Sequence, residues 1–519
     1  MTTAPSETLD AARSRVRAAW SPELLASAGQ RMMELLSTHL SSVESSGQKV
    51  LNWAEPADSI ARAMSCLDEN STASGASTSA KNSPEQPLLL ERFEQLVQLM
   101  LASGHNLHDP RYLGHQVPAS VPIAGLFDAV GAVTNQVMAI YEMGPWATSV
   151  EAAVVEQLGR LIGWDAGEFA GVVTHGGSLA NLTALLTARN VCLGDAWERG
   201  ISSGEDGPVL VSHGEAHYCI ARSAGILGLG TDQVIKAALD ERRRIDPCQL
   251  DQTLRRLRQQ NRPIVAVVAC ACATPIGAFD PLVDIADVCA RHDVWLHVDA
   301  AHGGAACFSR KHRHLVEGLD QADSLIWDAH KMLFVPALCA FVFYRNREHR
   351  FEAFRQDAPY LFDPSDPGLA EYDSGLKTIE CTKRAAAFGL WGTWSLFGRE
   401  LFGDLVDITF DLGQQLYRRL QEAEDFVPLH EPECNIVVFR HIPRQLREAP
   451  PAELGQFQLA LRKELVRSGE YYIVPTAKDG VAALRVTLIN PLTGSDQLDG
   501  LLDALRTHGR RLLSGVDAG

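Results

Sequence analysis

The chain has 519 residues, 46% of them hydrophobic and 21% charged, which is typical of a globular protein with two or three domains. A net charge of −17 at pH 7 argues against nucleic acid or an anionic membrane surface as a partner. It does not exclude an anionic substrate, because a single site can be locally basic. The eleven cysteines include no Cys-x-x-Cys pair, which predicts reduced thiols and a cytoplasmic location rather than a disulfide framework.

The N-terminal part of the chain, residues 1–120, is predicted to be a helical segment because its apolar residues recur at helical spacing. Residues 69–87 are rich in Ser, Thr, Ala and Asn and predict a linker or disordered loop, after which a helix resumes over 88–101. Residues 1–20 lack the apolar core of a secretory signal. No apolar run approaches the roughly 18 residues of a membrane span.

Predicted strands and helices alternate over residues 121–400. The predicted strands are 171–174, 209–212, 264–271, 294–299, 324–327 and 338–344, and helices such as 178–192 and 281–292 fit between them. Several of the strands are continuous apolar runs, as buried parallel strands are. The pattern indicates a mainly parallel α/β sheet covered on both faces, and such sheets bind ligands at the carboxyl ends of their strands.

The C-terminal part, residues 401–519, predicts a small α+β domain. Short strands are expected at 436–439, 471–474 and 484–488, and helices at 453–468 and 495–513. The last helix is expected to begin behind a Ser495 N-cap.

A lysine, Lys331, follows the apolar run 324–327 through the polar residues Asp328-Ala329-His330. Taken alone it would be a surface lysine. Apolar residues flank it on both sides, so partial burial is expected to lower its pKa and to favour the neutral amine. A neutral amine can form an imine with the aldehyde of pyridoxal 5'-phosphate (PLP).

A carboxylate, Asp299, ends the preceding strand 294–299. A carboxylate beside such a lysine can keep the pyridine nitrogen of PLP protonated, so that the ring acts as an electron sink. His297, Asp299 and His302 could instead be metal ligands. The small residues that follow Asp299 favour close approach of a flat ring, and we predict no metal site.

Three further turns follow predicted strands. Gly176-Gly177-Ser178 precedes a helix, where backbone N–H groups can bind a phosphate, although such turns are also common as plain connections. His217 could stack on a heteroaromatic ring or be an ordinary hydrogen-bonded histidine. Thr274, in a turn shaped by Pro275 and Gly277, could bind a ring substituent or a substrate carboxylate.

These motifs, in this order, resemble the group II PLP-dependent amino acid decarboxylases of fold type I. The resemblance covers roughly residues 85–510 and rests on the segments 175–181, 216–218, 277–280, 297–304 and 328–331. It implies an aspartate aminotransferase-like large domain and a homodimer with active sites at the interface. Residues 374–384 could be contributed across that interface.

The resemblance also implies roles for single residues. Lys331 would form the imine, Asp299 would pair with the pyridine nitrogen, and His217 would stack on the opposite ring face. The other residues expected to contact the cofactor are Gly177, Ser178, Thr274, Ala301 and His330.

Two more matches concern the reaction and the substrate. Tyr360, in a segment 345–376 rich in Asp, Pro and Gly, resembles the lid tyrosine that protonates the substrate carbon after carbon dioxide leaves; an exposed loop tyrosine is the alternative. Arg485, in an apolar strand, resembles the arginine that binds a carboxylate in acidic-substrate decarboxylases. A structural salt bridge is the alternative for Arg485.

The chain departs from the family pattern in two places. Asp328-Ala329 replaces the usual Asn-Pro before His-Lys, and Gly114-His115 replaces the Asn-Gln pair of glutamate-type enzymes. His115 and Gln116 therefore become candidate substrate-binding residues. We expect decarboxylation of aspartate, glutamate or cysteine sulfinate. L-2,4-diaminobutyrate, an aminotransferase or lyase reaction on the same fold, and a catalytically silent scaffold protein are the alternatives.

Overall fold

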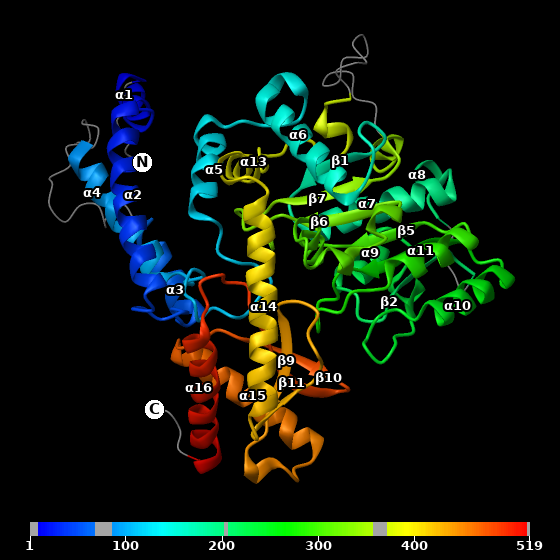
Figure 1. Ribbon diagram of the computed structural model, residues 1–519. Helices are drawn as coiled ribbons and strands as arrows, with labels where there is room; N and C mark the ends of the chain where they lie inside the picture. The colour runs from blue at the N-terminus through cyan, green and yellow to red at the C-terminus, as the bar shows by residue number, and fades with distance from the viewer. Residues whose placement is uncertain (1–8, 68–85, 202–205, 356–370, 516–519) are drawn as a thin grey trace, which may run out of the picture. The chain divides into compact units, whose positions relative to one another are not determined.

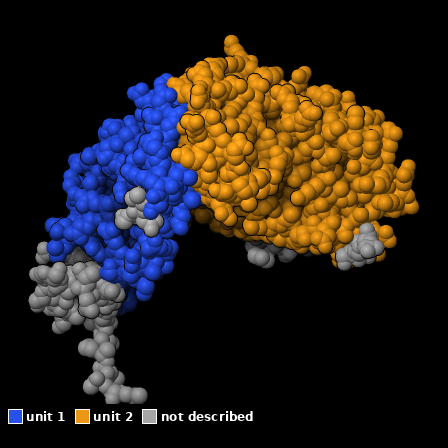
Figure 2. Space-filling model, turned by 90° about the horizontal axis from the view of Figure 1, so that it is seen from below, with its two compact units in different colours: residues 1–112, 460–472, 494–519 blue, residues 113–459, 473–493 orange. Residues whose placement is uncertain are grey.

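The computed structural model describes residues 9–67, 86–201, 206–355 and 371–515. They divide into two compact units, coloured separately in Figure 2. One unit is drawn from residues 1–112, 460–472 and 494–519, and the other from residues 113–459 and 473–493. No helix of the described residues is long and apolar enough to cross a membrane.

The first unit is helical. It contains α1 (Leu9–Ala19), α2 (Pro22–Glu44), α3 (Pro56–Ser65), α4 (Gln86–Ser103), the end of α15 (Pro451–Ser468) and α16 (Ser495–Ser514). Helix α2 begins with Ser21, whose Oγ accepts a hydrogen bond from the Leu24 N–H at 3.1 Å. Arg31 of α2 pairs with Glu94 of α4 at 2.6 Å.

Residues 86–87 and Ser495 differ from their predicted structure in this unit. The linker predicted over 69–87 lies outside the described residues, except that Gln86 and Pro87 already belong to α4. The N-cap predicted at Ser495 is wrong, because Ser495 is the first helical residue of α16 and Gly494 precedes it. The Gly494 N–H donates to Gln497 Oε1 at 2.9 Å, so the helix start is closed from inside by a glutamine.

The second unit is built on a seven-stranded sheet with the order β1-β7-β6-β5-β4-β2-β3 (Figure 1). Its strands are β1 (Ala170–Thr174), β2 (Val209–His213), β3 (Val234–Ala237), β4 (Ile264–Cys270), β5 (Leu296–Asp299), β6 (Ser324–Asp328) and β7 (Ala340–Tyr344). The pairs β2–β3, β2–β4, β4–β5 and β5–β6 are parallel, whereas β7 runs antiparallel to both β1 and β6. The mainly parallel α/β sheet is therefore confirmed.

The burial of this sheet explains its sequence pattern. Every residue of β2, β4, β5, β6 and β7 is buried, and successive residues of a strand point to opposite faces, so both faces are covered. Helix α7 (Gly177–Leu193) packs on β4, β6 and β7. The strand that sequence reasoning missed, β3, lies at the sheet edge and is only partly buried, so it has no long apolar run.

A second, antiparallel sheet has the order β10-β11-β9-β8, with β8 (Phe426–Pro428), β9 (Ile436–His441), β10 (Val474–Lys478) and β11 (Val481–Thr487). Helix α14 (Glu400–Glu422) packs on β8 and β9. The strand expected at 471–474 is wrong in position, because β10 begins at Val474. Asp479 and Gly480, both with positive φ, form the two-residue hairpin that sets the β10–β11 register.

Candidate functional site

The carboxyl ends of β5 and β6 bring together the two residues on which the prediction depends. Strand β5 ends at Asp299 and the neighbouring parallel strand β6 ends at Asp328, three residues before Lys331. The Lys331 N–H donates to the Asp328 carbonyl at 3.1 Å, which turns the chain back over the strand end. The Lys331 amine then lies 3.3 Å from Asp328 Oδ2.

The expected direction of the Lys331 pKa shift is wrong. Burial alone would lower the pKa, but the carboxylates of Asp328 and Asp299 outweigh it and raise the pKa above its ordinary value. The sequence suggested burial but could not show that two carboxylates converge on the amine. In the protein without cofactor, the amine is therefore stabilised as a cation.

Asp299 is held from two sides. Its Oδ1 accepts a hydrogen bond from the Ala301 N–H at 3.2 Å, and its Oδ2 accepts one from the Asn181 side-chain amide at 3.2 Å. Asn181 lies on α7, one turn after Gly177, and its amide also donates to the Gly177 carbonyl at 3.1 Å. Asn181 was part of the recognised motif, but no role was predicted for it.

His217 lies just after β2 and is partly buried. Burial lowers the pKa of its imidazole, while the charges of Asp299 and Lys331 act on it in opposite directions. Its Nδ1 accepts a hydrogen bond from the Cys219 N–H at 3.4 Å. The charges of Asp299 and Lys331 therefore both affect the imidazole pKa, and all three side chains lie at the same edge of the sheet.

The predicted phosphate turn combines two glycines with the N-terminus of α7, and it packs closely against Asp328. Gly176 has φ of +104°, and a Cβ on Gly177 would lie 2.7 Å from the carboxylate oxygens of Asp328. Ser178 follows in the first turn of α7, whose N-terminal N–H groups point out of the helix. His330 is buried, with Nδ1 2.9 Å from the Cys339 carbonyl. The glycine turn and the free N–H groups of the helix N-terminus are the features that can bind a PLP phosphate, and the Asp328 carboxylate packs against the same turn.

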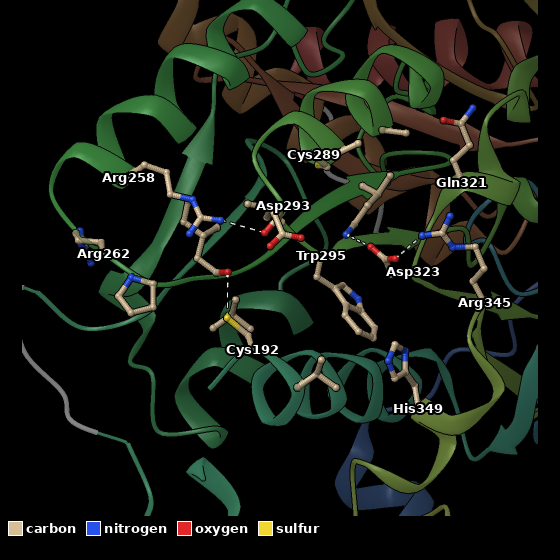
Figure 3. A pocket seen from close by; sticks show the side chains of 18 of the residues that line it. Cys192, Arg258, Arg262, Cys289, Asp293, Trp295, Gln321, Asp323, Arg345 and His349 are labelled. Atoms are coloured by element: carbon tan, nitrogen blue, oxygen red, sulfur yellow. Dashed lines mark hydrogen bonds and ion pairs between the residues drawn. The ribbon is translucent and has the colours of Figure 1, made fainter. Parts of the chain in front are cut away.

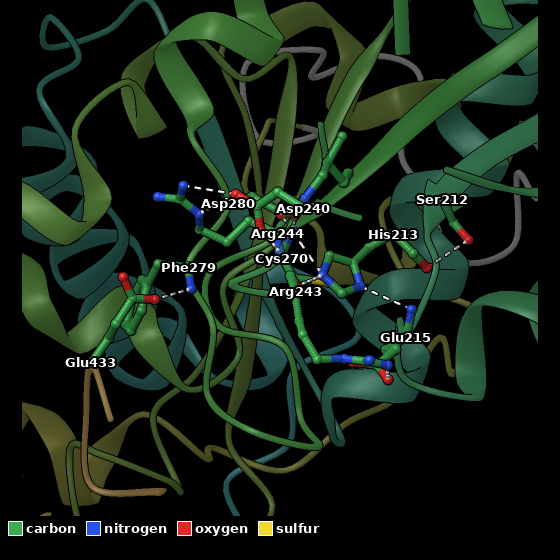
Figure 4. Close-up of polar contacts among 11 residues, drawn as sticks. Ser212, His213, Glu215, Asp240, Arg243, Arg244, Cys270, Phe279, Asp280 and Glu433 are labelled. Carbon is green, nitrogen blue, oxygen red and sulfur yellow. Dashed lines mark hydrogen bonds and ion pairs between the residues drawn. The ribbon is translucent and has the colours of Figure 1, made fainter. Parts of the chain in front are cut away.

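The turn that carries Thr274 is fixed by a buried polar cluster, shown in Figure 4. Asp280 accepts hydrogen bonds from the N–H groups of Cys270 at 2.8 Å and Ile245 at 2.7 Å. The His213 ring nitrogen Nε2 lies 3.7 Å from Asp280, whose pKa burial raises. The cluster ties the end of β4 to the end of the turn, and so it holds the partly buried Thr274.

Arg485 lies on β11 and is buried, with an Nε that has no hydrogen-bond partner among the described residues. Its Nη2 is 3.5 Å from Thr487 Oγ1, and burial lowers its pKa to about 10. Buried His302 lies near it. Burial, followed by the positive charges of Lys331 and Arg485, lowers the His302 pKa to about 3. His302 is therefore close enough to both Lys331 and Arg485 for their charges to affect its pKa.

The segment with His115 and Gln116 is anchored near both of these cations. Its Leu113 carbonyl accepts a hydrogen bond from the Thr487 N–H at 2.9 Å, and its Val121 N–H donates to the Phe334 carbonyl at 2.7 Å. Gln116 is buried and His115 is exposed. Tyr360 lies outside the described residues, so its position relative to the site stays a prediction.

The histidines that could have been metal ligands have other partners. His297 bonds Asn181 and Ser324, both at 2.9 Å, and His302 bonds Asn435 at 2.8 Å. Within the described ranges, no group of three or more His, Cys, Asp or Glu residues is arranged to hold a metal ion.

A cavity of about 870 Å³ lies at the other end of the sheet (Figure 3). It is lined by residues at the amino ends of β4, β5 and β6, among them Ile264, Trp295 and Asp323. None of the predicted site residues lines it. The candidate site is instead at the carboxyl ends of the strands, where the charged side chains of Asp299, Asp328 and Lys331 come together.

Comparison with known proteins identifies the family. The model of the pyridoxal-dependent decarboxylase conserved domain matches residues 72–442. The acidic amino acid decarboxylase GADL1 of Bos taurus is 32% identical over 81% of this chain and 81% of its own length. The cysteine sulfinic acid decarboxylase of Mus musculus is 31% identical over 90% of this chain and 92% of its own length.

Solved structures agree. The crystal structure of mouse CSAD superposes with a TM-score of 0.81 at 28% identity, covering 94% of this chain and 99% of that one. A rice TDC structure with PLP and tryptamine, at 19% identity and a TM-score of 0.80, shares the fold. The chain therefore belongs to the pyridoxal-dependent decarboxylase family, and it is a PLP-dependent amino acid decarboxylase.

Proposed function

We propose that this chain decarboxylates an acidic L-amino acid at its α-carbon. The observation that carries the proposal is Arg485, a buried arginine whose Nε has no partner in the described part of the chain. A buried cation without an anion is costly, and the planar guanidinium binds a carboxylate through two parallel hydrogen bonds. A carboxylate or sulfinate on the substrate side chain would supply the missing anion. The names of the relatives in cattle and mouse, which state acidic substrates, support this.

The residues around Lys331 are those that we propose to hold the cofactor. Bound PLP withdraws electrons from the bond that breaks. Lys331 would attach it covalently through its amine, Asp299 would hold a proton on the ring nitrogen, and His217 would cover one ring face. The residues proposed to complete the cofactor site are Gly177, Ser178, Thr274, Ala301 and His330.

The reaction end needs one proton. Decarboxylation breaks the bond between Cα and the α-carboxylate, releases carbon dioxide and leaves an electron pair that must accept a proton at Cα. We propose Tyr360 as the donor of that proton. His115 and Gln116, on the segment anchored near Thr487 and Phe334, would contact the substrate beside Arg485.

The test of this function compares purified wild-type protein with Lys331→Ala. Wild-type protein with added PLP should release carbon dioxide from aspartate, glutamate or cysteine sulfinate. Borohydride should fix the cofactor to the peptide that carries Lys331, as read by mass spectrometry. Lys331→Ala should lose both signals. Release only from L-2,4-diaminobutyrate would contradict the acidic substrate, and label retained on Lys331→Ala would contradict the lysine assignment.

We also propose a homodimer in the cytoplasm. Helices α5 (Pro122–Thr134) and α13 (Phe388–Phe397) pack together and expose large apolar side chains, which mark association surfaces on soluble proteins. These side chains are Leu126, Val130, Val133, Leu396 and Phe397. All eleven cysteines lie in described residues and none is in a disulfide, in keeping with a reducing compartment.

The dimer can be tested by light scattering on the purified chain. A mass of twice 56.6 kDa is expected for the wild type. Val130→Asp together with Val133→Asp should reduce it to the mass of one chain. A wild-type monomer with full activity would contradict the dimer.

A further inference from the structure

A line of five side chains runs through the sheet and ends at Asp299. Trp295 Nε1 lies 2.9 Å from Ser324 Oγ, which lies 2.9 Å from His297 Nδ1. His297 Nε2 lies 2.9 Å from Asn181 Oδ1, and the Asn181 amide nitrogen lies 3.2 Å from Asp299 Oδ2. Trp295 lines the cavity of Figure 3, at the end of the sheet opposite to Lys331. The line therefore crosses from one end of the sheet to the other.

The chemistry of the two ends fixes the direction of every hydrogen bond. A carboxylate only accepts, so the Asn181 NH2 must face Asp299 and its Oδ1 must accept from His297 Nε2–H. The neutral imidazole then accepts at Nδ1, so the Ser324 hydroxyl donates to it. The indole of Trp295 can only donate, which leaves Ser324 Oγ as its acceptor. Every hydrogen bond along the line is therefore donated toward Asp299, and the second N–H of the Asn181 amide donates to the Gly177 carbonyl.

The surroundings of His297 agree with this assignment. The residue is fully buried, and burial lowers its pKa to about 4, so the ring is neutral at pH 7. Asn181 and Ser324 are also buried. Aligned hydrogen bonds in a region of low dielectric polarise one another, so the hydrogen bond from the Asn181 side chain to Asp299 is stronger than an isolated one.

We propose that Asn181 and His297 are positioning residues that hold the Asp299 carboxylate toward the cofactor ring nitrogen, with Ser324 and Trp295 fixing the histidine tautomer. The proposal rests on the proposed pairing of Asp299 with that nitrogen. Ala301 holds one carboxylate oxygen from the backbone, and Asn181 holds the other from the helix. Without Asn181 the carboxylate could rotate about its Cβ–Cγ bond. The ring nitrogen would then lose part of the charge that keeps it protonated.

The test reads the ring nitrogen directly. Apoprotein is reconstituted with PLP carrying ¹⁵N in the ring, and the nitrogen resonance is recorded for each variant. Asn181→Leu should move the resonance toward that of the unprotonated ring and weaken PLP binding about 10-fold, the usual effect of losing a hydrogen bond to a charged group. His297→Leu should act in the same direction by a smaller amount. Ser324→Ala and Trp295→Phe should follow in decreasing order.

A conservative variant separates positioning from packing. His297→Gln keeps one N–H donor for Asn181 and one oxygen acceptor for Ser324, so it should restore most of the resonance position. His441→Leu is the matched control: it removes an equally buried histidine from the antiparallel sheet. It should lower the unfolding temperature without moving the resonance.

Two outcomes would contradict the proposal in different ways. If Asn181→Leu and His297→Leu lower only the unfolding temperature, as His441→Leu does, the line is structural and the inference is wrong. Asp299→Asn is the reference for the proposed function. If that variant also leaves the resonance in place, Asp299 does not pair with the ring nitrogen, and the proposed function fails at that point.

Discussion

Two lysines of the same unit, buried Lys383 and partly buried Lys331, differ in how completely their amines are bonded. Lys383 has one acceptor for each of its three N–H groups: Glu151 Oε1 at 2.6 Å, Glu151 Oε2 at 2.8 Å and the Val173 carbonyl at 2.8 Å. Its side chain is 1% exposed. Lys331, whose side chain is 19% exposed, has one ion-pair partner among the described residues, Asp328 at 3.3 Å. A saturated amine is a structural element, whereas an amine with N–H groups to spare can react.

The unsatisfied atoms show the same contrast on a larger scale. Buried polar atoms almost always have a hydrogen-bond partner, so each exception needs a reason. Asp328 Oδ1, Arg485 Nε and His302 Nδ1 are three exceptions in the described part of the chain, and each belongs to a residue near Lys331 or Arg485. The three N–H groups of Lys383 and both carboxylate oxygens of Glu151, by contrast, all have partners. The site is therefore incomplete as a protein structure and fits groups supplied by cofactor and substrate.

The largest expected effect on stability comes from breaking the saturated pair. Lys383→Met leaves the Glu151 carboxylate buried without its cation, which costs about 3–5 kcal/mol of unfolding free energy. The double variant Glu151→Leu with Lys383→Met should recover most of this loss, because two apolar groups replace a buried ion pair. Chemical denaturation followed by circular dichroism measures both values.

Lys331→Met is the counterpart in this comparison. A partly exposed amine with one ion pair contributes about 0–1 kcal/mol, so the unfolding free energy should change by less than about 1 kcal/mol while activity is lost. A loss as large as that of Lys383→Met would show that the two lysines do not differ in structural role.

A further prediction concerns Arg485, a buried cation with no carboxylate partner among the described residues. Arg485→Met removes a buried unsatisfied group, so it should raise the unfolding free energy by about 1–3 kcal/mol. The same variant should raise KM for an acidic substrate at least about 10-fold, since a hydrogen-bonded charge pair is lost. Higher stability with lower activity is the expected pattern for a functional cation. A decrease in stability would instead mean that Arg485 is structural.

The sequence locates Lys331 better than it locates Lys383. Lys331 and Asp299 follow apolar runs that end at the same sheet edge, so their local pattern is enough to locate them. Lys383 and Glu151 are 232 residues apart, and no local pattern joins them. Likewise, the hydrogen-bonded line to Asp299 combines α7, β5 and β6, which only the folded chain brings into contact.

The errors have physical causes as well. The start of β10 was misplaced because the Asp479-Gly480 hairpin, rather than the apolar pattern, sets the register of that strand. The direction of the Lys331 pKa shift was predicted wrongly because the flanking residues indicate burial, which lowers the pKa, but do not show the carboxylates that raise it. Asp328 is three residues from Lys331 in the sequence, but the approach of Asp299 depends on where the ends of β5 and β6 meet, which no local stretch of sequence shows.

The smallest effect on the protein is expected from replacing Asp328, the ion-pair partner of Lys331. The Asp328 carboxylate helps to raise the Lys331 pKa, so below that pKa most of the amine is charged and unreactive. Asp328→Asn removes the charge, and burial then acts to lower the pKa. The neutral fraction at pH 7 should rise about 10-fold for each unit by which the pKa falls. Covalent attachment of PLP to apoprotein should accelerate accordingly, and its pH–rate curve should move to lower pH.

The measurement is the rate at which visible absorbance appears when PLP is added to apoprotein over a range of pH. Asp323→Asn is the matched control, because Asp323 precedes the same strand at its other end and pairs with Arg345 at 2.6 Å. That variant should leave the pH–rate curve unchanged. If Asp328→Asn also leaves it unchanged, the single ion pair does not govern the reactivity of Lys331. The contrast between Lys331 and Lys383 would then rest only on the N–H groups of the Lys331 amine that have no bonded acceptor, and not on the charge of Asp328.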